Sequence, residues 1–423
     1  MAGRSPGTGT AYVASHRVKA TSPAIIDELL QEYGGRVEYN LGAGSAGFDA
    51  PQSVAATFVS ASCSSERKGK LESFCGYGDV AGDADLRSHF TQKLVEQYGA
   101  DPFGDLGVIV TAGANNAFVT AILGCTDVGD EVVVPSPFYF SHEMVLQTHG
   151  VQMVRSPRLP PAMLPSVDDM VARFSPRTRA VVLTSPCNPT GAVLCKSECQ
   201  RLLRACRERA IWLIFDAAYE HFVYENGTGD TSDGLPLPCA SDGVMYLFTM
   251  SKSYALAGIR VGFLVHPPHM TDQLLKVQDA NITHPTRFSQ HIALHVLRSS
   301  TSSWHAQHRS YLKQIRDRLV ELLRPVVPTL NCPHGAFYLF IPLPPGTLDA
   351  EAAHFLARTY GLLLIPGSAF GTLALTNGDT QYLRLSFAKL TLTDTETVAA
   401  RLRAGLSALS QRPSPRKLDV KTV

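Results

Sequence analysis

Lys252 is the residue whose surroundings in the sequence most favour covalent chemistry. It follows the apolar run Met245–Met250 and has hydroxyl and basic residues nearby, namely Thr249, Ser251 and Arg260. A solvated surface lysine fits poorly with the apolar run before it. Burial and a nearby cation both lower the pKa of a lysine, and the neutral amine is a nucleophile. We therefore expect Lys252 to be a nucleophile in a ligand site.

Two further polar positions follow apolar stretches. Asp216 ends the stretch Ile211–Asp216, and Tyr219 comes three residues later. A buried carboxylate is costly unless a cation faces it, so we expect a positive group opposite Asp216. The alternative is a cap for a following helix. Asn188 stands between two prolines in Ser185–Gly191, and its rigidly presented amide can both donate and accept hydrogen bonds.

The segment Thr111–Asn116 joins a predicted strand to a predicted helix through small residues. Backbone amides at such a helix start can bind phosphate, although a packing turn fits the same residues. Gly42–Gly47 matches the dinucleotide-binding motif G-x-G-x-x-G. That motif requires a helix at its third glycine, and none is expected here, so a flexible loop is the better interpretation. The closely spaced histidines within residues 291–308 have no glutamate between them, and no metal site is expected.

Elements that could position these motifs alternate along the middle of the chain. Short apolar runs predict strands buried on both faces, and segments with helical periodicity lie between them. The strands are expected at Val108–Thr111, Glu131–Val134, Ala180–Thr184, Ile211–Asp216 and Val244–Met250, and the helices at Asp85–Tyr98, Asn115–Leu123, Ser141–His149 and Lys196–Ala210. This alternation predicts an α/β fold with a doubly wound, mostly parallel sheet. Each motif then lies at the carboxyl end of a strand, where such sheets bind ligands.

The two ends of the chain have a different pattern, which predicts a smaller α+β domain built from both of them. Its elements are expected at Pro23–Tyr33, Val37–Leu41, Trp304–Leu323, Gly335–Ile341, Leu362–Ile365, Tyr382–Phe387 and Thr393–Leu409. We therefore divide the chain into residues 1–50, an N-terminal arm with part of the small domain, residues 51–300, the large domain, and residues 301–410, the rest of the small domain. Residues 411–423 are expected to be a disordered tail.

Composition excludes several classes of protein. The 423 residues carry 38 Lys+Arg and 37 Asp+Glu, a balance that argues against a nucleic-acid-coating protein. No apolar run of about 18 residues predicts a membrane span, and no secretory signal is expected at the start. The nine cysteines form no C-x-x-C pair. A cytoplasmic enzyme is the expectation.

Taken together and in this order, the motifs resemble those of class I and II aminotransferases, which are fold-type I pyridoxal-phosphate enzymes. The most specific motif runs from Thr249 to Gly262, and the Ser185–Gly191 stretch and the Asp216/Tyr219 pair accompany it. The resemblance extends from about residue 15 to about residue 408. It implies an enzyme that uses pyridoxal 5′-phosphate to move the amino group of an L-amino acid to a 2-keto acid.

The resemblance also implies roles for individual residues. Lys252 would form the Schiff base with the cofactor and shuttle a proton, and Asp216 would face the pyridine nitrogen. Tyr219 and Asn188 would bind the ring oxygen, and Tyr139 would stack on the ring. The phosphate would be held by Ala114, Asn115, Thr249, Ser251 and Arg260.

For the substrate, the resemblance implies that Arg384 grips the α-carboxylate, with Gly44 and Asn188 beside it. Tyr77 would reach the phosphate of a neighbouring subunit, which implies a homodimer with shared active sites.

Some residues depart from the family pattern. Where relatives usually have Gly-Glu-Pro-Asp-Phe, this chain has Gly44-Ser-Ala-Gly-Phe48, and no Lys or Arg lies between Asn115 and Asp130. We therefore expect a neutral, apolar or aromatic amino acid in preference to aspartate. Arg287 could supply a replacement charge, but a surface role is the simpler interpretation.

Two other functions compete with transamination. The same scaffold supports elimination, replacement, cyclisation of the aminocyclopropane-carboxylate synthase type, or oxidation of an amino acid. A non-enzymatic binding protein is also conceivable, but the presence of Lys252, Asp216 and Arg384 together argues against it.

Overall fold

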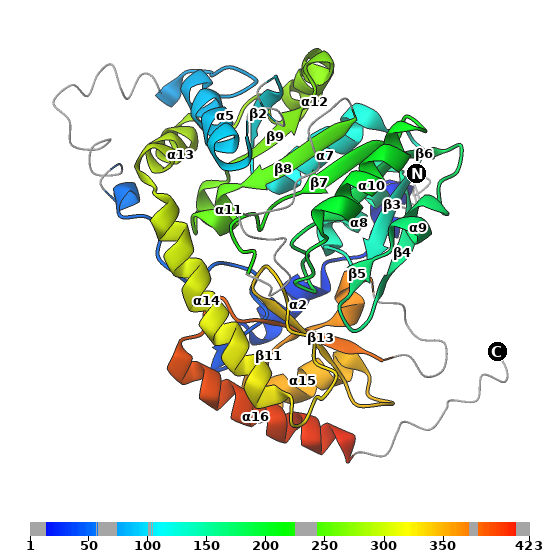
Figure 1. Cartoon of the computed structure of the whole chain (residues 1–423), viewed down its shortest axis with the longest axis vertical. Coiled ribbons are helices and arrows are strands. Elements are labelled where there is room, and N and C mark those ends of the chain that lie inside the picture. The colour runs from blue at the N-terminus through cyan, green and yellow to red at the C-terminus, as the bar shows by residue number, and fades with distance from the viewer. Residues whose placement is uncertain are drawn as a thin grey trace, which may run out of the picture.

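The computed structural model describes residues 14–55, 57, 74–99, 103, 105–224, 243–371 and 380–411. A large sheet with helices on both faces forms one part of the molecule, and a smaller part with two short sheets lies beside it (Figure 1). Within the described residues, no helix is long and apolar enough to cross a membrane.

The large sheet has eight strands in the order β2-β9-β8-β7-β6-β3-β4-β5. Their bounds are β2 Gly107–Thr111, β3 Glu131–Ser136, β4 Gln152–Leu159, β5 Leu164–Pro165, β6 Thr178–Thr184, β7 Trp212–Asp216, β8 Val244–Thr249 and β9 Gly262–His266. The five strands from β8 to β4 pair in parallel, whereas β9 runs antiparallel to both of its neighbours. The predicted α/β fold with a mostly parallel sheet is confirmed.

Helices cover both faces of this sheet. They are α5 Ala84–Tyr98, α7 Ala114–Cys125, α8 Phe140–His149, α9 Val167–Val171, α10 Lys196–Arg207, α11 Met250–Ser253, α12 Thr271–Ile282 and α13 Arg287–Ser299. One buried apolar cluster joins the sheet to α5, α10 and α13, and a second joins its other face to α7, α8 and α12. The strands are buried on both faces because each face meets a helix layer, which explains their continuous apolar sequences.

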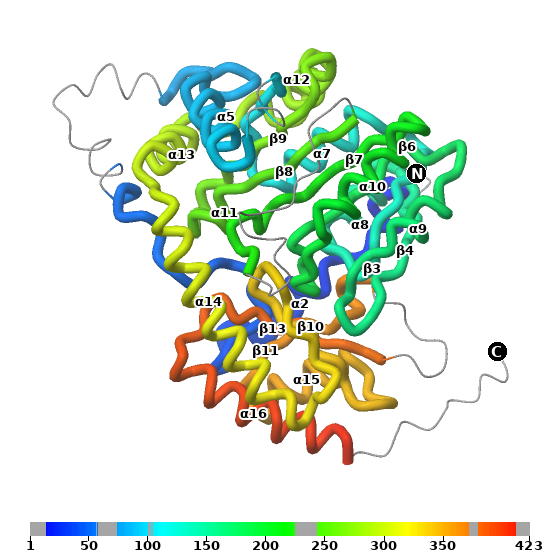
Figure 2. Tube along the Cα trace, viewed as in Figure 1, coloured from blue at the N-terminus to red at the C-terminus, as the bar shows by residue number. Residues whose placement is uncertain are grey.

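The smaller part combines segments from both ends of the chain. Its strands are β1 Tyr39–Asn40, β10 Tyr338–Pro342, β11 Leu362–Leu363, β12 Ile365–Pro366 and β13 Tyr382–Ser386, and its helices are α2 Ile25–Tyr33, α14 Ser302–Leu323, α15 Asp349–Tyr360 and α16 Leu392–Ser410. In Figure 2 the blue N-terminal trace lies among the yellow-to-red C-terminal segments. The pairing of β1 with β11 fixes this arrangement, since Tyr39 is in register with Leu362.

The described part of the N-terminal arm is more ordered than the sequence predicts, and the predicted tail is not tested. Residues His16–Ala20 form a short helix, α1, which packs against α8. Ser15 caps it by accepting a hydrogen bond from the Val18 amide at 3.4 Å. Residues 1–13 of the predicted arm and 412–423 of the predicted tail lie outside the described residues.

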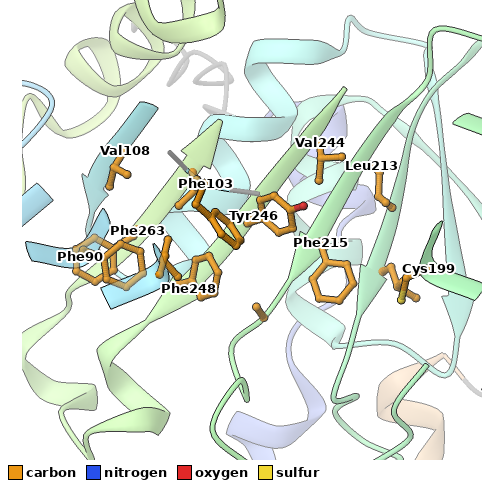
Figure 3. Close-up of a cluster of buried hydrophobic side chains, with 14 of the residues drawn as sticks. Phe90, Phe103, Val108, Cys199, Leu213, Phe215, Val244, Tyr246, Phe248 and Phe263 are labelled. Carbon is orange, nitrogen blue, oxygen red and sulfur yellow. The ribbon is translucent and has the colours of Figure 1, made fainter. Parts of the chain in front are cut away.

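Aromatic side chains form the core between α5 and the antiparallel strand β9 (Figure 3). The rings of Phe90 and Phe263 stack with centroids 3.7 Å apart and an interplanar angle of 5°. Phe248 meets Phe90 edge-on at 5.4 Å. All three side chains are buried. The stack fastens α5 to the sheet edge that carries β2 and β9.

We expect Phe263→Ala to lower the free energy of unfolding by about 3–5 kcal/mol, because the ring leaves a cavity that the sheet cannot close. Phe263→Leu should cost less, since it refills part of that space. Urea unfolding followed by circular dichroism measures both. Leu392→Ala, at a position 42% exposed, is the control. An equal loss in Phe263→Ala and Leu392→Ala would contradict the packing argument.

Candidate active site

A cavity of about 240 Å³ lies at the carboxyl ends of the parallel strands. Every site residue predicted from the sequence lines it except Tyr77: Gly44, Ala114, Asn115, Tyr139, Asn188, Asp216, Tyr219, Thr249, Ser251, Lys252, Arg260 and Arg384. It also contains residues that the sequence analysis did not single out, namely Ile26, Phe140, His142, Thr184, Ala218 and Tyr338. The predicted residues, which are up to 340 positions apart in the chain (44 to 384), therefore meet in one place.

Strand register brings the polar ends of three strands together. Thr184 at the end of β6 is in register with Asp216 at the end of β7, and Asp216 is in register with Leu247 of β8. Thr249 then ends β8, and the short helix α11 carries Lys252 into the cavity. Parallel strands that end at one edge thus present their following residues to a common space.

The amine of Lys252 is partly buried and has no salt-bridge partner among the described residues. Its Nζ donates a hydrogen bond to the carbonyl oxygen of Gly44 at 2.7 Å. Burial, and after it the charges of Arg384 and Arg260, together lower the pKa of Lys252 to about 8, whereas Asp216 opposes the shift. A substantial fraction of this amine is therefore neutral near pH 8, as a nucleophile requires.

An anion-binding arrangement stands at the start of α7. Gly113 occupies the N-cap position with φ 85° and offers no side chain, so the first amides of the helix remain open. The Arg260 guanidinium lies beside them and donates to the Ala112 carbonyl at 3.2 Å. A Cβ on Gly113 would come within 2.4 Å of the guanidinium, so this approach requires glycine. Thr249 and Ser251 add hydroxyls from the neighbouring strand end. Helix amides, hydroxyls and a guanidinium together suit a phosphate group.

Asp216 is buried at the end of β7 and has two partners. One carboxylate oxygen accepts from the Ala218 amide at 3.0 Å, and the other lies 3.3 Å from His142 Nε2. Residues 217–224, the described stretch after Asp216, form no helix, so the alternative that Asp216 caps the start of one is wrong. The cation expected opposite it is not a lysine or arginine. His142, from α8, holds that carboxylate in place while its ring packs against Phe118.

Arg384 is a buried guanidinium without a carboxylate partner among the described residues. It is 2% exposed and comes from β13. Its Nη1 donates to Asn188 Oδ1 at 2.9 Å, and its Nη2 donates to the Gly42 carbonyl at 2.5 Å. The rings of Tyr338 and Phe370 flank it, each 4.7 Å from the guanidinium carbon. A buried charge of this kind needs an anionic ligand, and its planar fork suits a carboxylate.

Two tyrosine hydroxyls meet on the cavity wall. The Tyr219 and Tyr338 oxygens lie 2.7 Å apart. Tyr139 stands at the start of α8, and burial raises its pKa to about 12, so it is a neutral aromatic wall. The sequence does not single out Tyr338, because its strand has the pattern of an apolar core strand, nor His142, because a single histidine near a helix start carries no specific signal.

Tyr77 and Arg287 lie outside this cavity. Tyr77 is 89% exposed, and its ring centroid is 6.0 Å from that of His284. Arg287 donates to the Gly76 carbonyl at 3.4 Å. Both residues thus belong to one exposed patch, and neither contacts the cavity of its own chain.

The donor set of the cavity fits pyridoxal phosphate. The amides at the α7 start, with Arg260 and the hydroxyls, suit the phosphate, and Asp216 suits a protonated ring nitrogen. Lys252 supplies the amine that the cofactor's aldehyde requires, and Arg384 remains for the carboxylate of a substrate. No cluster of three or more potential metal ligands occurs among the described residues.

Comparison with known proteins gives the same result. The sequence profile of the family described as aminotransferase class I and II matches residues 37–402. An aromatic aminotransferase of Arabidopsis thaliana is 31% identical over 79% of this chain and 82% of its own. An aspartate aminotransferase of Pyrococcus abyssi is 28% identical over 88% and 93%. The structure of the aspartate aminotransferase from Thermus thermophilus with maleate superposes with a TM-score of 0.81 at 25% identity, over 94% and 100% of the two chains. The chain belongs to the class I and II aminotransferase family, whose members use pyridoxal phosphate to transfer amino groups.

Proposed function

We propose that the enzyme transaminates a neutral, apolar or aromatic L-amino acid with a 2-keto acid as acceptor, through a Schiff base at Lys252. The observation that carries this proposal is the meeting of Lys252, Asp216 and Arg384 in one cavity. When bound, pyridoxal phosphate supplies a reactive carbonyl carbon and an electron-accepting ring.

Lys252 is proposed to act twice. Its neutral amine would hold the cofactor covalently, and as a free amine it would move the proton of the substrate's Cα. A base works best when its pKa is near the operating pH, and the pKa of about 8 for Lys252 meets that condition. The 2.7 Å bond to the Gly44 carbonyl holds the amine at the cavity wall.

Asp216 is proposed to keep the ring nitrogen of the cofactor protonated. Its buried carboxylate has His142 on one oxygen and the Ala218 amide on the other, so its orientation is fixed from both sides. A buried anion favours the protonated form of the nitrogen that faces it. Asn188 and Tyr219 would bind the ring oxygen, Tyr139 would cover the ring, and the α7 amides with Thr249, Ser251 and Arg260 would hold the phosphate.

The preference for a neutral substrate rests on the charges that line the cavity. Its described lining has three cations, Lys252, Arg260 and Arg384. The proposal uses all three, for the amine, the phosphate and the α-carboxylate. No cation of the lining remains for a second carboxylate, whereas Ile26 and Phe140 offer apolar surface for a side chain. The relative from Arabidopsis thaliana named an aromatic aminotransferase is consistent with this preference.

We also propose a cytoplasmic homodimer in which each active site receives residues from both chains. The 89% exposure of Tyr77 supports this proposal, because an aromatic ring so exposed is available to a second subunit. Arg287 lies in the same patch, where its hydrogen bond to the Gly76 carbonyl agrees with the surface role expected for it. Each subunit would consist of a large domain, residues 51–300, and a small domain, residues 1–50 and 301–410.

The pKa of Lys252 yields a kinetic prediction. Only the neutral amine attacks an aldehyde, so the rate at which cofactor-free protein captures pyridoxal phosphate should rise with pH and level off above about 8. Stopped-flow absorbance measures the rate. Borohydride reduction followed by peptide mapping should label Lys252, and Lys252→Ala should remain unlabelled while the control Lys276→Ala is labelled normally. A label on another lysine would overturn the assignment.

Asp216→Asn keeps the shape of the side chain and removes its charge. We expect kcat to fall by at least ~10²-fold, about 2.7 kcal/mol in barrier, because the ring nitrogen then loses its proton more easily. Asp272→Asn, at an exposed position on α12, is the control and should leave kcat unchanged. Near-normal turnover of Asp216→Asn with cofactor bound would contradict the role.

The proposed reaction is tested by following both substrates. Phenylalanine should convert the bound cofactor to its amine form, with kcat/KM at least ~10-fold above that for aspartate. Each mole of keto acid released should be matched by one mole of new amino acid from the acceptor. Arg384→Lys should raise KM for both donors, because a point charge replaces the fork. Keto acid released with ammonia, without need of an acceptor, would instead indicate elimination or oxidation.

A further inference from the structure

The contact between Tyr219 and Tyr338 joins the two halves of the active site. Tyr219 belongs to the turn after β7 of the large sheet, and Tyr338 is the first residue of β10 in the smaller part. Their hydroxyl oxygens lie 2.7 Å apart, and both side chains are buried, with 4% and 0% exposure. Neither hydroxyl makes another hydrogen bond within the described part of the chain.

Tyr338 is also in contact with the groups that surround the substrate carboxylate. The guanidinium carbon of Arg384 lies 4.7 Å from the centre of its ring. A Cβ on Gly44 would come within 2.8 Å of its hydroxyl, so the Gly44 backbone closes over that end of the side chain. Tyr338 therefore touches the proposed carboxylate site on one side and the proposed cofactor residue Tyr219 on the other.

The two hydroxyls hold two protons, of which only one can lie in the bond between them. The second proton is free to bind another acceptor. Which tyrosine carries this second proton depends on which of the two hydroxyls donates to the other. The more acidic phenol is the better donor. Burial raises the pKa of both tyrosines, and the Arg384 charge opposes that rise at both. The guanidinium lies directly over the ring of Tyr338, where its effect is second only to burial, whereas at Tyr219 it is a lesser cause. This favours Tyr338 as the donor.

We propose that Tyr338 is a positioning residue that donates its hydroxyl proton to Tyr219, so that the Tyr219 proton is directed into the cavity. The proposal rests on the proposed function, in which Tyr219 binds the ring oxygen of the cofactor. It adds a link between the two ligand sites. A carboxylate bound to Arg384 neutralises the charge over the Tyr338 ring, weakens Tyr338 as a donor, and so weakens the hydrogen bond that Tyr219 gives to the cofactor.

Other charged and titratable groups face this pair and act on the same titration. Lys252 comes from α11, Asp216 from the end of β7, and Tyr139 and His142 from the start of α8. The Arg260 guanidinium is at the phosphate end of the cavity. Because Tyr338→Phe changes none of them, a difference between that variant and the normal enzyme reports the hydroxyl alone.

The test is the absorbance titration of the bound cofactor in the holoenzyme. A hydrogen bond to the ring oxygen stabilises the unprotonated form of the chromophore, so losing the Tyr338 donor should raise the midpoint by about half a pH unit. Tyr219→Phe should raise it further, and the double variant should match Tyr219→Phe because the two residues act in series. Tyr224→Phe is the matched control, since it removes another buried tyrosine hydroxyl, bonded to the Ala336 carbonyl at 2.6 Å.

The link to Arg384 is tested with 3-phenylpropionate, an unreactive carboxylate. It should raise the midpoint in the normal enzyme, and by a smaller amount in Tyr338→Phe. A fall of the midpoint in Tyr338→Phe would show that Tyr219 is the donor of the pair and would overturn the proposal. An unchanged midpoint, or effects that add in the double variant, would overturn it as well.

A fluorinated tyrosine and the formation of the holoenzyme provide two further checks on the role of Tyr338. If Tyr338→Phe does not fold, 3-fluorotyrosine at position 338 preserves the shape and makes a more acidic donor, and the midpoint should then fall. Failure of the chain to form a holoenzyme with the cofactor on Lys252 would refute the proposed function itself. A normal holoenzyme whose titration ignores Tyr338 would refute only the proton direction inferred here.

Discussion

The buried guanidinium of Arg384 is the constraint around which the active site is organised. It is 2% exposed, and no carboxylate of the described chain pairs with it. The protein stabilises this charge with the Asn188 amide, the Gly42 carbonyl and the faces of two aromatic rings, none of which cancels it. A carboxylate ligand would cancel it, so binding of the proposed substrate carboxylate would remove an electrostatic cost that folding leaves in place.

The same residue couples the two parts of the molecule. Arg384 comes from the small sheet, whereas Asn188, its hydrogen-bond partner, comes from a loop of the large sheet. Ser136 and Phe138 of the large part also bond to the backbone of Gly371 and Phe370 across the same boundary. The residues proposed to bind the cofactor and those proposed to bind the substrate carboxylate are thus held in one geometry by direct contacts, as a reaction between two bound groups requires.

Much of this arrangement could be predicted from the sequence, for identifiable reasons. The apolar runs of β3, β6, β7 and β8 are unambiguous because both faces of each strand are covered. The antiparallel strand β9, Gly262–His266, was missed because it follows the Lys252 motif directly and has no separate signal. Helices α12, α13 and α15 were missed as well. Of these, α13 does have apolar residues at helical spacing, Phe288, Ile292 and Val296, so the sequence contains a signal for that helix.

Functional residues that belong to a recognisable sequence motif, such as Lys252 and Asn188, could be predicted from the sequence. Residues whose role depends only on their position in the folded structure could not. His142 and Tyr338 look in the sequence like ordinary helix and strand residues, and only the fold brings them against Asp216 and Tyr219. The partner of the Asp216 carboxylate illustrates the difference between these two kinds of residue. The sequence indicated that some partner was needed, but the choice of a histidine from α8 depends on tertiary packing.

The pairing of β1 with β11 has a consequence for synthesis of the chain. Tyr39 is among the first described residues to emerge, yet its partner Leu362 follows more than three hundred positions later (362 − 39 = 323). The anion site at Gly113 and Arg260 is complete much earlier, together with the amine of Lys252. On the ribosome, the residues proposed to bind the cofactor can therefore come together before the proposed carboxylate site, which needs Arg384, has been synthesised. A nascent chain at that stage carries the proposed phosphate ligands and the Lys252 amine, but not yet Arg384, the proposed ligand of the substrate carboxylate.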